Sequence, residues 1–277
     1  MLVFHNHCQL GNQMFIYACA HSLAKEKQVK YCLSQLKDLS YFELAKEDKW
    51  NSIKFIAFRI KNLFIKYKFE HLQDNRRDYS EELKKTINKD TWYYGYFQGE
   101  KYFYDNIKEI KARFKIKSEV INQFNLLKNK EIGNKEYTII HIRLKDYKTF
   151  GPRHLNGPDL TLPFSYYHNL IRKVLAKDKE QQFVFLSDDI NQIKNEFNYV
   201  KNAYFSLNSP IIDLQFIIKA QTCILSCSTF SWWGAWLNEN IKKCIYVPKN
   251  FLGFKVNKEY PINIIPKNWN QVEIYNN

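Results

Sequence analysis

The chain has 277 residues, of which 42 are lysine or arginine and 28 are aspartate or glutamate, so its formal net charge is +14. Hydrophobic residues make up 45% of the sequence, enough to bury a sizeable core, which excludes global disorder. The 8 glycines and 7 prolines are too few for a collagen-like or low-complexity chain. The positive charge indicates an anionic partner: nucleic acid, a membrane surface or a phosphorylated small molecule.

The six cysteines are scattered without a CxxC pair, a pattern typical of reduced thiols in a cytoplasmic protein. The N-terminal residues lack the basic start and apolar run of a signal peptide, and no window approaches the roughly 18 apolar residues of a spanning helix. We therefore expect a cytoplasmic protein, soluble or at most peripheral on the inner face of the cytoplasmic membrane.

The N-terminal part reads as the start of an α/β domain. A strand is expected at 2–4, a helix to about 25 after the Leu10-Gly11-Asn12 loop, and a strand at 29–33. The segment 50–69 fits a helix better than a strand. Its apolar face could lie on an anionic membrane, or could face the core while its lysines are solvated, which is the commoner outcome.

Residues 74–90 are polar and predict a loop followed by a helix. A polar run near 130–135 places the domain boundary there, giving domains 1–132 and 133–277. From 137 onward, β-branched or aromatic runs alternate with helical patterns, which predicts a doubly wound α/β domain with a parallel sheet. Strands are expected at 137–143, 183–186, 203–205, 223–225 and 244–247, with four helices between them.

Ligands of open α/β sheets bind outside the carboxyl ends of the strands, so the residues that follow each strand are the informative ones. They offer an arginine, a hydroxyl cluster and a glycine turn at helix starts, which together would cradle a phosphate or diphosphate. Each has an ordinary structural alternative: an ion pair, a helix cap or a simple turn. The set comprises Gly11, Asn12, Gln13, His141, Arg143, Asp146, Asp188, Asp189, Ser228, Thr229, Phe230 and Ser231.

The sequence gives little support for a metal site, because the chain has no DxD motif and its histidines lack HExxH-like spacing. His5 and His7 share one face of a strand, but such a pair is more often structural. The chain also has no GxSxG elbow, Walker A loop or GxGxxG, which argues against a serine hydrolase, a P-loop NTPase and a typical NAD enzyme.

Five segments carry a resemblance to a known family. They are LGNQMFIYA at 10–18, GYFQGEKYF at 95–103, the HxRxxD pattern at 141–146, the SDD turn at 187–189, and STFSWWGAWL at 228–237. With these motifs, which reach both ends and thin out between 34 and 92, the chain resembles the bacterial alpha-1,2-fucosyltransferases.

The resemblance implies a GT-B-like fold, with two Rossmann-like domains facing a cleft. It implies inverting, metal-independent transfer of L-fucose from GDP-fucose to the 2-hydroxyl of a β-galactoside acceptor, an oligosaccharide or glycolipid, in bacterial surface glycan synthesis such as that of O-antigen. No cofactor is expected. By the same resemblance Arg143 would bind the diphosphate, and His141 with Asp188 or Asp189 would contact guanine or ribose. The phosphates would be contacted by Gly11, Asn12, Gln13, Ser228, Thr229, Phe230 and Ser231.

Two positions depart from the family pattern: Leu144 stands where many relatives have a second arginine, and Cys8-Gln9 stands where many have Gly-Gly. The general base is open, because Asp146 could act as the base or could only orient Arg143. The other candidates for the base are His154 and Asp159, with Glu100 behind. On the acceptor side the candidates are Tyr96, Gln98, His154 and Asp159.

Two alternatives stand beside fucosyl transfer. One is a GDP-sugar transferase of different linkage or acceptor, since the acceptor cleft would be built from the variable middle of the chain. The other is a basic nucleic-acid-binding protein, but the lysines are dispersed and no RNP-like or zinc signature is present.

Overall fold

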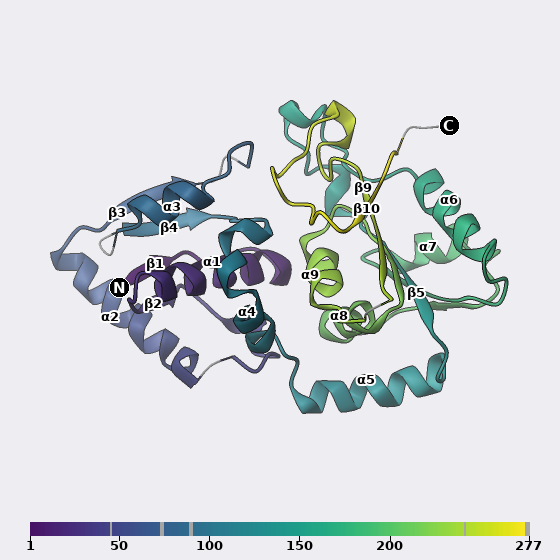
Figure 1. Ribbon diagram of the computed structural model, residues 1–277, viewed down its shortest axis with the longest axis horizontal. Helices are drawn as coiled ribbons and strands as arrows, with labels where there is room; N and C mark the ends of the chain where they lie inside the picture. Colours follow the sequence, from purple (N-terminus) through teal and green to yellow (C-terminus); the bar gives the residue numbers. More distant parts are fainter. Residues whose placement is uncertain (45, 73–74, 89–90, 241, 275–277) are drawn as a thin grey trace. The chain divides into compact units, whose positions relative to one another are not determined.

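The computed structural model describes residues 1–44, 46–72, 75–88, 91–240 and 242–274 (Figure 1). The chain divides into two compact units, each described by itself below. The first comprises Met1–Lys117 and Pro261–Pro266, and the second comprises Ser118–Tyr260 and Lys267–Asn277.

The first unit is built on a four-stranded parallel sheet of order β2-β1-β4-β3. Its strands are β1 (Leu2–Phe4), β2 (Tyr31–Leu33), β3 (Lys68–Leu72) and β4 (Thr91–Gly95). Its helices are α1 (Leu10–Glu26), α2 (Asn51–Phe64), α3 (Ser80–Thr86) and α4 (Ile107–Arg113), with 3-10 turns at Lys37–Leu39, Lys46–Trp50, Glu100–Tyr102 and Tyr104–Asn106. Helix α1 is buried along nearly its whole length, which explains why its sequence is apolar on every side.

The predicted strand and helix at the N-terminus and the predicted helix near 50–69 are confirmed. Helix α3 lies within the segment expected to be a loop followed by a helix, although residues 74 and 89–90 of that segment fall outside the described part of the chain. The expectation that α2 turns its apolar face to the core is wrong. Of its 14 residues only Asn51 and Phe58 are buried, while Leu63 and Phe64 are more than 80% exposed.

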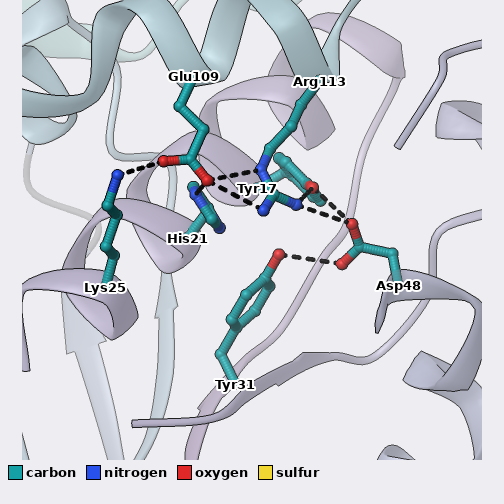
Figure 2. Close-up of polar contacts among 7 residues, drawn as sticks. All are labelled: Tyr17, His21, Lys25, Tyr31, Asp48, Glu109 and Arg113. Atoms are coloured by element: carbon teal, nitrogen blue, oxygen red, sulfur yellow. Dashed lines mark hydrogen bonds and ion pairs between the residues drawn. The ribbon is translucent and has the colours of Figure 1, made fainter. Parts of the chain in front are cut away.

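A network of charged and phenolic side chains ties several elements of the first unit together (Figure 2). The Arg113 guanidinium donates to Asp48 at 3.2 Å, to the Tyr17 hydroxyl at 3.0 Å and to Glu109 at 3.1 Å. The Tyr17 hydroxyl in turn donates to Asp48 at 2.7 Å. Because Arg113 comes from α4, Tyr17 from α1 and Asp48 from the turn before α2, one guanidinium joins three elements distant in sequence.

The second unit is built on a six-stranded parallel sheet of order β10-β9-β8-β5-β6-β7 (Figure 1). Its strands are β5 (Tyr137–Ile142), β6 (Gln182–Ser187), β7 (Ala203–Phe205), β8 (Thr222–Ile224), β9 (Cys244–Pro248) and β10 (Asn270–Val272). Its helices are α5 (Ser118–Glu131), α6 (Phe164–Leu175), α7 (Ile190–Glu196), α8 (Pro210–Lys219) and α9 (Thr229–Leu237), with 3-10 turns at Asp146–Lys148, Arg153–Leu155 and Phe254–Val256. The five predicted strands are confirmed. Strand β5 lies between β6 and β8, so the chain order reverses there, which is where open α/β sheets bind ligands.

The division between the units falls at Lys117, earlier than the boundary at 132–133 that the polar run suggested. Helix α5 belongs with the second unit because Phe124 on α5 packs edge-on against Phe216 on α8, with ring centroids 4.9 Å apart. A buried apolar contact therefore decides the boundary, and the polar run after α5 is only a surface turn.

The Trp-Trp-Gly segment of α9 is core, as expected for closely spaced tryptophans. Trp232 and Trp233 are fully buried, and Trp236 stacks on Trp232. Gly234 is required by a close approach between helices, because a Cβ atom there would lie 2.6 Å from the Cβ of Ile217 on α8. The contact fixes α9, and with it the start of that helix, against α8.

Arg113→Met should destabilise the protein strongly, because it leaves the buried Asp48 carboxylate without its cation. Loss of one partner of a buried ion pair costs on the order of 3–5 kcal/mol of unfolding free energy. Lys25→Met is the control: Lys25 also pairs with Glu109, but its side chain is 54% exposed, so the expected loss is below about 1 kcal/mol. Thermal melting compares the two variants, and equal shifts would contradict the role of Arg113.

Asp213, in the first turn of α8, should make stability depend on pH. Desolvation raises its pKa to about 7, against the opposing hydrogen bond that the Ser206 hydroxyl donates at 2.5 Å. Between the ordinary aspartate pKa and 7 the unfolded chain is ionised there while the folded chain holds a proton. Stability should therefore fall as pH rises through this window, by up to about 1.4 kcal/mol per pH unit.

Asp213→Asn removes this slope. The difference in melting temperature, Asp213→Asn minus wild type, should increase from pH 5 to pH 8. Asp178→Asn, at an exposed aspartate, should show no such trend. A constant difference between Asp213→Asn and wild type over this range would refute the raised pKa.

Candidate functional site

The carboxyl end of β5 presents a buried, neutral histidine. His141 lies with its Nδ1 2.8 Å from the Ser226 hydroxyl, which follows β8. Burial and the charge of Arg143 lower the pKa of His141 to about 3, so the imidazole carries no charge near neutral pH. Its ring also lies 5.9 Å from that of Phe230. His141 can therefore exchange neutral hydrogen bonds and stack, but it cannot serve as a cation.

Two residues beyond His141, the Arg143 guanidinium is held by carboxylates from two loops. It makes a bidentate pair with Asp146, both bonds being 2.8 Å, and its Nε lies 3.4 Å from Asp188. Partial burial lowers the pKa of Arg143, but these two carboxylates outweigh it and raise the pKa overall, so the group stays cationic. A planar guanidinium fixed in this way has the geometry that binds phosphate oxygens.

Asp188 has a second task, which explains why it follows β6 directly. Its carboxylate accepts hydrogen bonds from the backbone N–H groups of Leu144 at 2.9 Å and Lys145 at 3.0 Å. The loop that carries Arg143 is thereby fixed to the end of β6. Asp189, beside it, accepts from the backbone of Gln192 and caps α7. The side chain of Leu144 is buried.

The start of α9 supplies a helix N-terminus at the same edge of the sheet. Ser228 precedes the first turn with an extended backbone, and its side chain makes no capping bond. The Ser231 hydroxyl donates to the Ser228 carbonyl at 3.1 Å, so Ser231 acts locally. The Tyr147 hydroxyl donates to the Cys227 carbonyl at 2.6 Å, which fixes the loop that precedes α9. The partial positive charge of this helix end faces the region beyond β8.

The structure thus brings together, at the ends of β5, β6 and β8, most of the residues that the sequence selected in this half of the chain. The pairing of Ser226 with His141 was not predicted, although the register of β5 against β8 places His141 at the end of β5 and Ser226 just beyond β8. His154 and Asp159 lie in the exposed loop after β5. His154 packs against the ring of Tyr260, and Asp159 accepts from Thr161 within its own loop.

In the first unit, the Gly11-Asn12-Gln13 turn opens α1 and is closely tied to its surroundings. Gln13 donates to Asp38 at 2.6 Å and to the Cys8 carbonyl at 2.8 Å. Gln98 donates to the Asn12 side chain at 2.8 Å, which links the two motifs at 10–18 and 95–103. Cys8 has φ +63°, a conformation that favours glycine, which gives a backbone reason for the family's glycine at this place.

A stack of rings lies at the ends of β1 and β4. The sequence indicated that His5 and His7 share a face, but not that tyrosines stack on them. His7 lies face to face with Tyr94, with centroids 4.4 Å apart, and also contacts His5 and Tyr96. Burial lowers the pKa of both histidines, and His7 further lowers that of His5. The signal was the alternation His-x-His just after β1 and Tyr-x-Tyr at the end of the paired strand β4, since alternate residues of an extended chain point to the same side.

Among the described residues no group of three or more histidine, cysteine or acidic side chains is placed to hold a metal ion. A search of the same residues finds no helix with the length and apolar character needed to cross a bilayer.

Comparisons with known proteins place this geometry in context. Two curated relatives from Escherichia coli match most of the chain. The O-antigen biosynthesis glycosyltransferase WbnK is 28% identical, with 87% of this chain and 92% of the relative covered. An alpha-1,2-colitosyltransferase is 25% identical, with 82% and 84% covered.

Two solved structures share the fold. NodZ alpha-1,6-fucosyltransferase soaked with GDP-fucose has a TM-score of 0.51 at 12% identity, covering 85% of this chain and 92% of its own. POFUT1 in complex with GDP-fucose has a TM-score of 0.54 at 10% identity, covering 89% and 96%. The model of one family, Glycosyl transferase family 11, matches residues 1–273, and the chain therefore belongs to that family.

Proposed function

We propose that this glycosyltransferase moves L-fucose from GDP-fucose to the 2-hydroxyl of a terminal β-galactoside, with inversion and without a metal ion, in the synthesis of a bacterial surface glycan such as O-antigen. Membership of family 11, the naming of one relative for O-antigen biosynthesis and two fold neighbours with GDP-fucose support the donor class and the setting. The observation that carries the proposal is the Arg143 guanidinium, fixed at the sheet edge where α9 begins.

In this proposal the second unit binds the donor. Arg143 takes the diphosphate, and the start of α9, with Ser228, Thr229, Phe230 and Ser231, takes the phosphate oxygens. His141, neutral and buried, contacts guanine or ribose. Asp189 already caps α7, and Asp188 already holds the Arg143 loop, so we assign Asp188 chiefly to positioning.

The first unit would form the acceptor side of a GT-B-like pair of domains. Gln98 and Asn12, joined by their hydrogen bond, and Tyr96 beside the ring stack are polar and aromatic groups of the kind that bind sugars. Gly11 and Gln13 stay candidates for contact with the donor phosphates. His154 and Asp159 in the second unit stay acceptor-side candidates.

The reaction proposed is an in-line displacement. The acceptor hydroxyl attacks the anomeric carbon and passes its proton to a general base, for which His154, Asp159 and Glu100 are candidates. The bond to the β-phosphate oxygen breaks, and negative charge grows on the departing GDP. Arg143 and the positive end of α9 offset that charge, and one such donor in a water-poor site is worth on the order of 3 kcal/mol, or about 10²-fold in rate. Both oxygens of Asp146 accept from Arg143, which favours the orienting role over that of general base.

A second candidate function is transfer of colitose in place of fucose, favoured by the relative named alpha-1,2-colitosyltransferase. Colitose lacks the 3-hydroxyl group of fucose. A site that hydrogen-bonds this hydroxyl would reject colitose strongly, and an apolar site would not. Membership of a glycosyltransferase family leaves the nucleic-acid-binding alternative without support.

Product analysis tests the proposal. The enzyme is incubated with GDP-fucose or GDP-colitose and with lactose, N-acetyllactosamine and a type-1 disaccharide, and the linkage is read by NMR. We expect an α-linked fucose on the 2-hydroxyl of galactose. A colitosyl product with no fucosyl product would establish the second candidate, and a different linkage would overturn the proposed acceptor position.

Arg143→Lys should lower kcat by roughly 10²-fold at saturating donor, because lysine keeps the charge but loses the planar fork that binds two oxygens at once. Arg172→Lys, on the exposed face of α6, is the control and should turn over like wild type. Near-wild-type turnover of Arg143→Lys would remove Arg143 from the mechanism.

Asp146→Asn should lower kcat but leave the shape of the pH profile unchanged, because an orienting group need not lose a proton during the reaction. The measurement is kcat/KM from pH 5 to pH 9 for the variant and wild type. If kcat/KM of Asp146→Asn no longer fell at low pH, Asp146 would be the base instead.

A further inference from the structure

Helix α2 presents an apolar stripe to solvent. The side chains of Ile53, Ile56, Ile60, Leu63 and Phe64 are each more than half exposed. Their spacing of three or four residues puts them on one face of the helix. Isolated exposed apolar residues are ordinary on protein surfaces, but a continuous stripe along a whole helix marks a site of contact.

The opposite face of α2 fixes this orientation. The Asn51 side chain both accepts from the Leu33 N–H and donates to the Leu33 carbonyl, each at 2.8 Å, which ties the first turn to the edge strand β2. Phe58 is buried against Val3 and Cys32, with Trp92 beside it. The helix cannot roll its stripe inward without breaking these contacts, so the exposure of the stripe is built into the fold.

Positive charge surrounds the stripe. Between positions 49 and 69 the sequence has six lysines and arginines and no acidic residue. At about 100° per residue, Lys54 and Lys61 border one side of the stripe and Arg59 borders the other. Lys66 and Lys68 follow the helix end and are exposed, and Lys68 also pairs with Glu70 at 3.8 Å. Cations along both borders of an apolar face are the arrangement of helices that lie on anionic lipid surfaces.

We propose that α2 docks this protein on the surface of a bilayer containing anionic phospholipids. The apolar stripe enters the boundary between head groups and acyl chains, and the flanking cations lie at the lipid phosphates. With 14 residues the helix is about 21 Å long, too short to cross a bilayer but suited to lie in its plane. The inference depends on α2 alone and does not require the proposed transferase reaction.

The N-terminal end of α2 extends the same surface. Trp50, just before the helix, is 61% exposed, and tryptophan prefers the bilayer interface. Trp50 and Lys54 also line a cavity of about 520 Å³, whose wall includes Lys30. A lipid phosphate at this end would meet Lys54 and Lys30, whereas Arg113 and Lys25 in the same wall are paired with Asp48 and Glu109.

Charge distinguishes the bilayer from a second copy of the chain. A dimer through α2 would bring the six cations of one copy against the six of the other, and juxtaposed like charges cost several kcal/mol. An anionic lipid surface, in contrast, gains from each of them.

Vesicle sedimentation tests the proposal. The full chain is mixed with vesicles of phosphatidylglycerol and phosphatidylethanolamine, or of phosphatidylcholine alone. We expect at least about tenfold more bound protein with the anionic vesicles, and a decrease as salt is raised from 50 to 500 mM. Equal binding to both vesicle types, or binding to neither, would overturn the proposal without any use of variants.

Variants then locate the surface. Ile60→Ser/Leu63→Ser/Phe64→Ser should reduce vesicle binding about tenfold or more, because the apolar contribution is lost. The matched control is Leu126→Ser/Phe150→Ser/Leu207→Ser, three exposed apolar residues of the second unit. Since all six side chains are exposed, the melting temperatures of both variants should stay near that of wild type.

A charge pair of variants completes the test. Arg59→Gln/Lys61→Gln/Lys66→Gln should weaken binding to anionic vesicles on the order of tenfold to a hundredfold. Lys194→Gln/Lys201→Gln/Lys267→Gln, with the same net charge and exposed positions elsewhere, should bind as wild type. Equal losses in both triples would show general attraction and refute docking by α2. A concentration-dependent dimer, abolished by the serine triple, would replace the bilayer with a second copy.

Discussion

The candidate site depends on how one guanidinium is held. Arg143 lies at the carboxyl end of a buried strand, and its cation is kept in place by Asp146 from its own loop and by Asp188 from the neighbouring strand. Asp188 also fixes the backbone on which Arg143 is carried. Because two strands share this one ion-pair cluster, the position of the charge follows from the register of the sheet and does not depend on a flexible side chain.

His141 and the start of α9, which lie beside Arg143, add no second full positive charge. His141 is neutral because it is buried next to Arg143, and the start of α9 adds only the partial charge of its helix end. The charge of Arg143 is shared with two carboxylates, which fix the cation in position at this edge, while the lysines are spread over the surface. The net charge of +14 therefore divides into a single guanidinium assigned to the donor, a basic band along α2, and a general solvated excess.

Sequence patterns predicted five of the six strands described in the second unit, all but β10, and the residues that follow them, since parallel strands read as short buried runs and their ends meet at one edge. They could not predict which partner each residue takes. The ring stack of His5, His7, Tyr94 and Tyr96 depends on β1 pairing with β4, which lies 87 residues further on. Local periodicity in the sequence cannot predict the register between strands so far apart in the chain.

The same limit explains the two corrections. An amphipathic pattern in α2 shows that two faces differ, but only the contacts of Asn51 and Phe58 determine which face turns inward. The polar run near 130 looked like a linker, whereas the packing of Phe124 on Phe216 assigns α5 to the second unit. In both cases a buried contact made elsewhere in the chain outweighed a local signal.

The most direct test of the central claim is calorimetric binding of GDP and GMP to wild type and to Arg143→Gln. If Arg143 holds the diphosphate, wild type should bind GDP more tightly than GMP by about tenfold or more, the value of a charge-assisted hydrogen bond, and Arg143→Gln should lose most of that difference. An unchanged ratio of the two dissociation constants in Arg143→Gln would contradict the account.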